Sequence, residues 1–344
     1  MGRPTNRRIT ASVALIALLA ACTSGLPSPP QTSPSSSPTP TPSTSLPDPT
    51  TTPPTTPAAP STSAKPTTAK PTPPPTKPPR PPLAALPRGG QHILPAYRVV
   101  AYYGAPGGGD LGVLGRGTPD QAAAAVARQA SKYARFGRRI QPAMELIATV
   151  AQGSPGRDGL YSNPIPPSDI ASYLAAAHRH KLLLILDFQP GRGDFLPQVR
   201  RDEQFLLDPS VSVALDPEWK VGPTQVPAQV IGSSSAAGIN AVGRYLSGLV
   251  AKHRLPDKLL VVHEFTLPML PDRGNIRRPA GLEVVLHADG LATPARKIAV
   301  YHDLRFPCPP FHAGFKLFYR ADTGLMKPAQ VMALHPQPEI VTYQ

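Results

Sequence analysis

The sequence predicts an α/β protein whose folded part is a (β/α)8 TIM-like barrel, preceded by a lipoprotein signal and a disordered linker rich in Pro, Ser and Thr. From Arg98 onward, short apolar runs alternate with amphipathic stretches, and eight such runs occupy about 250 residues, the usual length of such a barrel. The clearest run, 182–188 (LLLILDF), is almost continuously apolar, which is typical of a parallel strand covered on both faces.

The expected elements follow one another in strand–helix order. Strands are expected at 98–104, 142–151, 182–188, 211–218, 259–265, 282–289, 314–319 and 340–343. Helices are expected at 119–136, 168–180, 194–207, 236–252, 294–304 and 328–334. A doubly wound open sheet is the alternative fold. It usually has fewer strands, and the glycine-rich segment 104–115 lacks the G-x-G-x-x-G spacing of its nucleotide-binding loop.

The first 21 residues have the pattern of a secretory signal peptide. Three arginines precede an apolar run at 9–21, which is shorter than the roughly 20 apolar residues that span a bilayer. The following Leu19-Ala20-Ala21-Cys22 resembles the bacterial lipoprotein box. This resemblance implies cleavage before Cys22, a diacylglyceryl group on its thiol and anchoring to the outer face of the cell membrane. An ordinary signal peptide with a chance cysteine is the alternative.

Residues 22–92 are expected to form a tether between the lipid and a folded domain at 93–344. Pro, Ser and Thr dominate the tether, so it cannot bury enough apolar surface to become ordered. Fully extended at about 3.1 Å per residue, it reaches on the order of 200 Å. The composition also suits O-glycosylation. If Cys22 carries lipid, Cys308 is the other cysteine and no intramolecular disulfide is expected.

The charge of the chain bears on its partners. A formal net charge of +14 suits a protein that lies beside an anionic membrane and cell wall. The sequence has no motif of interleaved aromatic and basic residues, and a secreted protein is in the wrong compartment for nucleic acid. We therefore expect no nucleic-acid partner.

Polar side chains follow the apolar runs at the positions where active sites form on barrels, the carboxyl ends of the strands. The sharpest group is Asp216-Pro217-Glu218-Trp219. In an extended strand Asp216 and Glu218 would share one face. Two neighbouring carboxyls can hold their pKa values apart, which suits general-acid catalysis at a glycosidic oxygen.

These residues resemble the end of the chitinase-type glycoside hydrolase motif D-G-x-D-x-D-x-E. The resemblance implies that Glu218 is the proton donor and Asp216 its electrostatic partner. The earlier motif positions differ, because Val211, Ser212 and Ala214 stand where the family has Asp, Gly and Asp. The chain from about 95 onward also resembles actinobacterial lipoproteins with glycoside-hydrolase-like barrels of unassigned activity, in segments 102–104, 149–154, 214–218 and 316–320.

The sequence therefore predicts one site at the strand ends, with no cofactor and no metal. The expected catalytic residues are Glu218, Asp216, Asp187 and Glu264. Glu264 would face Glu218 across the barrel mouth, unless the neighbouring His263 takes the inward position. The expected substrate-binding residues are Trp219, Gln189, Tyr102, Lys316, Tyr319 and Asp289. Asp187 could instead pair with Arg192, and Lys316 is expected to pair with Asp289 or Asp187 because buried lysines need a partner.

Three functions remain open on this sequence. The first is a surface-anchored, carbohydrate-active protein of glycoside-hydrolase type that acts on a cell-wall or extracellular polysaccharide. The second is a non-catalytic module that binds glycan or wall. The third is a metal-dependent hydrolase that uses His263, His287, Asp187 and Asp216, although the His-x-His and H-E-x-x-H patterns of such enzymes are missing.

Overall fold

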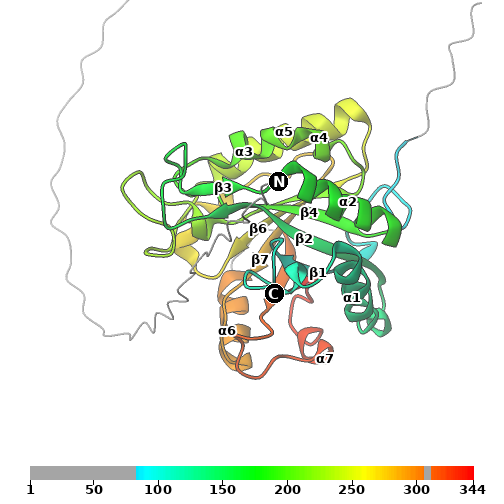
Figure 1. The fold of residues 1–344 in the computed structure, drawn as a ribbon. Coiled ribbons are helices and arrows are strands. Elements are labelled where there is room, and N and C mark those ends of the chain that lie inside the picture. The colour runs from blue at the N-terminus through cyan, green and yellow to red at the C-terminus, as the bar shows by residue number, and fades with distance from the viewer. Residues whose placement is uncertain (1–82, 306–310) are drawn as a thin grey trace, which may run out of the picture. The chain divides into compact units, whose positions relative to one another are not determined.

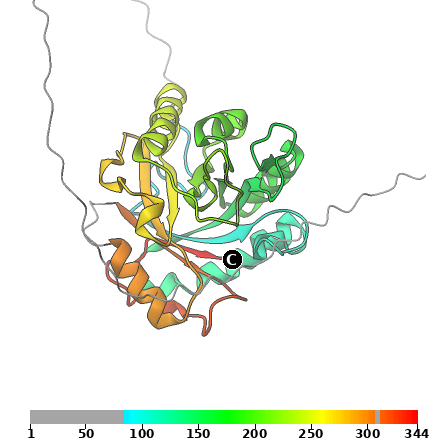
Figure 2. The ribbon, with the colours of Figure 1, turned by 90° about the vertical axis from the view of Figure 1, so that its left-hand side faces the viewer.

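The computed structural model describes residues 83–305 and 311–344. The predicted signal, Cys22, most of the predicted tether and Cys308 lie outside these residues. Within them, eight parallel strands form a closed ring: β1 (Tyr97–Gly104), β2 (Arg139–Ala151), β4 (Leu183–Phe188), β5 (Val211–Leu215), β6 (Lys258–Glu264), β7 (Leu282–Ala288), β8 (His312–Leu317) and β9 (Ile340–Tyr343). Because β1 also pairs with β2, the predicted (β/α)8 barrel is confirmed and the open sheet is wrong (Figures 1 and 2).

Helices cover the outside of the ring. They are α1 (Pro119–Ser131), α2 (Pro167–His180), α3 (Phe195–Arg201), α4 (Glu203–Leu206), α5 (Ala236–His253), α6 (Pro294–Arg305) and α7 (Pro328–Val331). Local capping fixes several starts. Thr118 and Gln121 form a capping box on α1, and the Ser235 side chain accepts a hydrogen bond from Gly238 N at the start of α5. Between β6 and β7 the described chain forms short 3-10 turns in place of an α-helix.

Several element bounds differ from the expected ones: the helix expected at 194–207 is split into α3 and α4, and the helix expected at 119–136 ends at Ser131. Two further differences lie near the carboxyl ends of the strands. A short strand, β3 (Ser162–Pro164), pairs antiparallel with the end of β2 and was not predicted. The fourth barrel strand ends at Leu215, three residues earlier than expected, and a 3-10 turn at Pro217–Trp219 follows it. Pro217 has no N–H to donate to a neighbouring strand, so it cannot continue the ladder.

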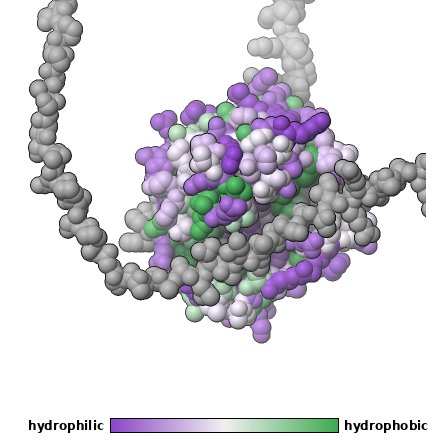
Figure 3. All heavy atoms as spheres, turned by 60° about the vertical axis from the view of Figure 1, so that its left-hand side comes forward, coloured by the Kyte–Doolittle hydropathy of each residue, from purple (hydrophilic) through white to green (hydrophobic). Residues whose placement is uncertain are grey.

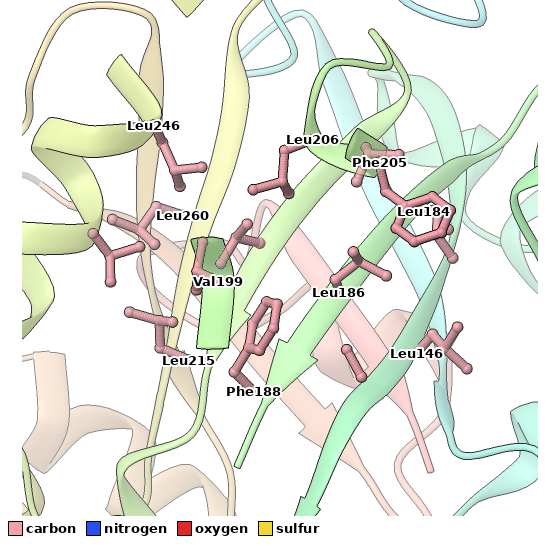
Figure 4. Packing of buried hydrophobic residues seen from close by; sticks show 14 of the residues in the cluster. Leu146, Leu184, Leu186, Phe188, Val199, Phe205, Leu206, Leu215, Leu246 and Leu260 are labelled. Carbon is pink, nitrogen blue, oxygen red and sulfur yellow. The ribbon is translucent and has the colours of Figure 1, made fainter. Parts of the chain in front are cut away.

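The main core lies between the strands and the helices. Side chains that point outward from the strands, among them Leu146, Leu184, Leu186 and Leu260, meet Val199, Phe205, Leu206 and Leu246 from α3, α4 and α5 (Figure 4). All of these side chains are buried. The alternate side chains of each strand point inward and form the barrel interior.

The barrel interior is layered by the alternation of side chains along each strand. An apolar layer fills its middle and includes Val99, Ala101, Leu183, Ile185, Ala214, Leu259, Val261, Val285 and Ile340. Further along the same strands, inward positions become polar, at Tyr103, Glu145, Asp187, His263, His287, Lys316 and Thr342. The apolar layer therefore separates a polar layer at the carboxyl ends, which we call the mouth layer, from the amino ends of the strands.

The segment before β1 packs against the amino ends of the strands. Leu86, Ile93 and Leu94 are buried in the same apolar cluster as Val99 and Leu259. The chain divides into a unit at Met1–Arg80 and a unit at Pro81–Gln344, so the packed unit contains residues that the sequence assigns to the tether.

The surface of the described chain is largely hydrophilic on the face drawn in Figure 3, with smaller hydrophobic areas between polar side chains. Among the described residues, none of the helices combines the length and apolar character needed to cross a membrane.

Candidate active site

Two buried cations in the mouth layer, His263 and Lys316, are paired with carboxylates. The imidazole of His263 lies between Glu145 Oε1 and Asp289 Oδ2, each 2.9 Å from a ring nitrogen. Lys316 Nζ lies 3.1 Å from the same Asp289 oxygen. Burial alone would raise the pKa values of Asp289 and Glu145. The positive charges of His263 and Lys316 outweigh this effect, so the pKa of Asp289 lies well below its usual range and the pKa of Glu145 is lowered. For the same electrostatic reason, the pKa values of His263 and Lys316 are raised despite burial.

The imidazole of His287 completes this ionic group. Its Nδ1 is 2.7 Å from Asp289 Oδ1, and its Nε2 is 3.1 Å from the Thr342 hydroxyl, which donates to Glu145 Oε2 at 2.9 Å. The neighbouring strand makes room for the ring with Gly314, because a Cβ there would lie 2.4 Å from His287 Cδ2. These contacts, with Gly314 on β8 and Thr342 on β9, hold the ring in place, and burial lowers its pKa, so His287 is not counted among the cations of the mouth layer.

Replacing Gly314 by Ala is expected to destabilise the protein, because the methyl group would overlap the buried imidazole. The expected loss in the free energy of unfolding is about 1–3 kcal/mol, the usual cost of overpacking. Urea denaturation of Gly248→Ala is the matched control. A Cβ at Gly248 meets nothing within 4 Å on an exposed part of α5, so that change should be neutral or stabilising. Equal stability of the two variants would contradict the tight packing around His287.

Three further carboxyl groups in the mouth layer have no cation of their own among the described residues. Burial is the main cause that raises the pKa of Asp187 to about 8 and the pKa values of Asp216 and Glu218 to about 7. Neighbouring carboxylates add to this effect, while the shared cations His263 and Lys316 reduce it. Burial and the sharing of two cations among five acids thus bring the titration of these three groups close to neutral pH.

The Asp187 carboxyl is held by two neutral side chains. Tyr103 OH donates to Asp187 Oδ2 at 2.8 Å, and Gln189 Nε2 donates to Tyr103 OH at 3.1 Å. The Tyr103 ring is itself covered by Lys316 Nζ, 3.6 Å from its centroid. Asp187 Oδ1 is buried without a hydrogen-bond partner in the described chain and lies 3.8 Å from His263 Nε2. Because Oδ2 accepts from Tyr103, a proton on Asp187 resides on Oδ1, where it faces no protein acceptor.

Glu218 lies at the outer edge of the mouth layer, in the turn after β5. Asp216 Oδ1 accepts a hydrogen bond from Glu218 N at 3.1 Å, and Gly232 N donates to Glu218 O at 2.7 Å. A Cβ on Gly232 would lie 2.4–2.6 Å from the carbonyl oxygens of this turn. Only a glycine at position 232 therefore allows the backbone to pack so closely against the turn. Glu218 is partly exposed, whereas Asp187 and Asp216 are buried. The pairing of Asp216 with Glu218 thus comes from a turn, and the expectation that one extended strand aligns them was wrong.

The structure gathers most of the predicted site residues but not all of them. Asp187, Asp216, Glu218, Gln189, Asp289 and Lys316 share the mouth layer, and Lys316 pairs with Asp289 as expected. Asp187 does not pair with Arg192, whose guanidinium covers the Tyr161 ring at 4.0 Å. Trp219 is half-buried in the turn beside Glu218.

Three expected residues point away from the mouth layer. His263 occupies the inward position at the end of β6, so the adjacent Glu264 points outward and pairs with Arg273 Nη1 at 2.8 Å. The prediction that Glu264 faces Glu218 is therefore wrong. Tyr102 also points outward, because the neighbouring Tyr103 takes the inward position, and its hydroxyl lies 3.3 Å from that of Tyr319. Tyr319 stacks on Tyr343 with ring centroids 5.2 Å apart, within the layer between strands and helices.

The sequence pattern did not assign Tyr103, Glu145 and Thr342 to the predicted site, and it named His287 only as a ligand in the metal-dependent alternative. All four lie at inward positions of their strands and are buried. A usable signal was present for Tyr103: it continues the two-residue alternation of Val99 and Ala101, which are inward and apolar.

Among the described residues, His263, His287 and Asp289 offer ligand atoms within 4.8 Å of one another. The residues fit an ion poorly, because each imidazole Nδ1 already contacts an Asp289 oxygen and the Lys316 ammonium occupies the same carboxylate. Asp187 and Asp216, the carboxylates expected in the metal-dependent alternative, do not belong to this trio.

Comparison with known proteins adds little beyond the fold. No protein-family model matches the chain, and no curated protein matches its sequence. Among solved structures, the chain is similar to a GH18 chitinase from Pseudoalteromonas aurantia, with 11% sequence identity and a TM-score of 0.34. The similarity covers 72% of this chain and 93% of the chitinase chain. A similarity at this level says nothing about activity.

Proposed function

We propose that this protein is a surface-anchored glycoside hydrolase that acts on a cell-wall or extracellular polysaccharide, with Glu218 as the general acid. One observation carries the proposal. Glu218 is a partly exposed residue at the edge of the mouth layer, and burial is the main cause that raises the pKa of its carboxyl to about 7, so the carboxyl carries a proton in a large share of the molecules near neutral pH. A protonated carboxyl that solvent can reach is what cleavage of a glycosidic bond requires.

The proposed reaction uses three carboxyls in different roles. Glu218 donates its proton to the glycosidic oxygen as the bond between that oxygen and the anomeric carbon breaks. Positive charge that develops on the sugar is stabilised by Asp216 in its ionised form, which is already populated before the reaction because the pKa of Asp216 is about 7. A water molecule then adds to the anomeric carbon and loses a proton to Glu218, which restores the acid.

In this proposal Asp187 binds substrate as a neutral donor. Its Oδ1 is buried without a protein partner, and burial raises its pKa to about 8. Tyr103 and Gln189 fix the carboxyl by a chain of hydrogen bonds. A sugar oxygen or carbonyl group that enters the mouth layer would accept the proton of Asp187 and satisfy an oxygen that is otherwise unpaired.

The location and substrate class rest on the amino-terminal sequence. A lipid on Cys22 and a long tether rich in Pro, Ser and Thr would hold the barrel outside the membrane, next to wall polymers. The basic net charge favours approach to anionic polymers of this kind.

A panel of purified wall and extracellular glycans, assayed with the full chain from pH 4 to pH 9, tests the proposal. We expect reducing ends to appear, with activity falling as the pH rises through about 7 because Glu218 loses its proton. The same assay with a chelator should give equal rates. Tight binding to wall polymer without turnover at any pH would instead support a non-catalytic role, and loss of turnover on chelation would support metal-dependent hydrolysis.

A further inference from the structure

We propose that His92, Asp257 and Glu283 form a binding site for a divalent cation at the amino ends of the strands, opposite the mouth layer. His92 lies in the segment before β1, Asp257 directly precedes β6, and Glu283 is the second residue of β7. Their ligand atoms all lie within 4.8 Å of one another. The site joins three segments that are far apart in the sequence, and nothing in the proposed hydrolysis uses it.

The donor set suits Zn²⁺. Imidazole nitrogen and carboxylate oxygen both bind zinc in proteins, and three such ligands leave a fourth tetrahedral position for water. His92 Nδ1 lies 2.5 Å from Asp257 Oδ2. Zinc bonds of about 2.0 Å require these atoms to be roughly 3.3 Å apart in a tetrahedral site. His92 can make this adjustment, because 73% of its side chain is exposed.

The local charge also favours a cation. With a neutral imidazole, the three side chains carry two negative charges, which a divalent ion would balance. In the part of the chain that the structure describes, neither Asp257 nor Glu283 is paired with a lysine or an arginine; their charged partners are His92 and His312. In the mouth layer, by contrast, two imidazoles and the Lys316 ammonium all contact the single Asp289 carboxylate.

A second layer of contacts orients the candidate ligands, as it does in established metal sites. His312 Nε2 lies 2.9 Å from Glu283 Oε2 and so orients this carboxylate. The other nitrogen of His312 contacts Glu339, and Glu339 Oε1 in turn accepts from Arg138 Nη1 at 2.6 Å.

The backbone next to the ligands is fixed as well. Asp257 N donates to Gln91 O at 2.8 Å, and Gln91 Nε2 donates to Ala84 O at 2.7 Å. Asp257 is thus attached to the segment that carries His92 before any ion binds. A bound cation would further tie the segment at 83–92, the last part of the predicted tether, to the base of the barrel.

Calorimetric titration of the full chain with Zn²⁺ tests this site. We expect binding of one ion that is weakened at least tenfold in His92→Ala and in Asp257→Asn, and 10–100-fold in His312→Gln, the usual cost of removing a second-layer partner. His178→Ala is the matched control, because His178 Nε2 also contacts one carboxylate, Asp208 Oδ2, at 2.8 Å, but without a second acid. It should bind like the wild type.

Substitution with Co²⁺ identifies the ligands. Nitrogen and oxygen ligands should give weak visible bands without the intense thiolate-to-cobalt band that a cysteine would produce. Zn²⁺ binding that is unchanged in both His92→Ala and Asp257→Asn would overturn the proposal, as would a thiolate band. His92→Ala should leave glycan turnover unchanged. The zinc-binding proposal and the proposed hydrolysis can therefore be refuted independently of each other.

Discussion

Replacing Glu218 by Gln is expected to lower kcat for glycan hydrolysis by about 10²–10⁴-fold, the usual contribution of a general acid. Gln keeps the size of the side chain and the backbone contacts with Asp216 and Gly232, but it has no proton to give. KM should change little, because the leaving oxygen needs the proton only in the transition state. A good leaving group, which departs without protonation, should recover much of the lost rate.

Glu264→Gln is the matched control for this experiment. Glu264 is also a glutamate at the end of a barrel strand, but it points outward and pairs with Arg273. Its loss should lower stability and leave kcat within a few-fold of the wild type. Equal rates for Glu218→Gln and the wild type would remove Glu218 from the reaction, and a large loss of kcat in folded Glu264→Gln would contradict the site described above.

Replacing Lys316 by Met is expected to lower the free energy of unfolding by about 3–5 kcal/mol, the usual cost of breaking a buried ion pair on one side. Lys316 and Asp289 are both largely buried, and the ammonium also covers the Tyr103 ring. Its removal leaves Asp289 with His263 as its one cation in the described mouth layer. Chemical denaturation followed by circular dichroism measures the loss.

The double variant Lys316→Met/Asp289→Asn separates charge from packing. Removing both partners should cost less than the sum of the single changes, because neither leaves an unpaired charge. Arg179→Met breaks a solvent-exposed pair with Asp120 and serves as the control, with an expected change below about 1 kcal/mol. A similarly small change for Lys316→Met would mean that the mouth layer is not held together by charge.

The stability of the protein should fall as the pH rises from 5 to 9. The pKa values of Asp187, Asp216 and Glu218 are raised on folding from ordinary values of 3.8–4.5 to about 7–8, so the folded state binds protons that the unfolded state has released. Their contribution is fully present below about pH 4 and is lost as the pH rises through 7–8, at about 1.4 kcal/mol per pH unit for each proton.

Thermal denaturation across this pH range measures the effect. Asp187→Asn should flatten the slope, because it removes one of the protons concerned. Below pH 4 the trend should reverse, since Glu145 and Asp289, whose pKa values are lowered on folding, become protonated there. A melting temperature that rises steadily between pH 5 and pH 9 would contradict the protonated state of these carboxyls.

The barrel and much of the site could be predicted from sequence because both depend on short-range patterns. Apolar runs of strand length, followed by polar residues, identify strand ends on a parallel barrel. Asp187, Asp216, Glu218 and Lys316 all follow this pattern, which is enough to assign them to one end of the barrel. The rule that a buried ammonium needs a carboxylate narrowed the partner of Lys316 to Asp289 or Asp187, and the structure has Asp289.

Side-chain direction was harder to predict, because a one-residue shift along a strand reverses which face a residue occupies. In the pairs Tyr102–Tyr103 and His263–Glu264, both neighbours are polar or aromatic, so composition does not say which one points inward. Tyr103 and His263 do so, held by Asp187 and Glu145 from other strands. The site around His92 was not predicted either, because its three residues come together only through the folded chain.

A carbon-13 NMR titration of the carboxyl groups tests the central claim most directly, with Asp187→Asn and Glu218→Gln used to assign the signals. Two buried cations shared among five acids predict apparent pKa values of about 8 for Asp187 and about 7 for Asp216 and Glu218. Titration of all three groups near their ordinary values of 3.8–4.5 would contradict it, and Glu218 could then not serve as a general acid at neutral pH.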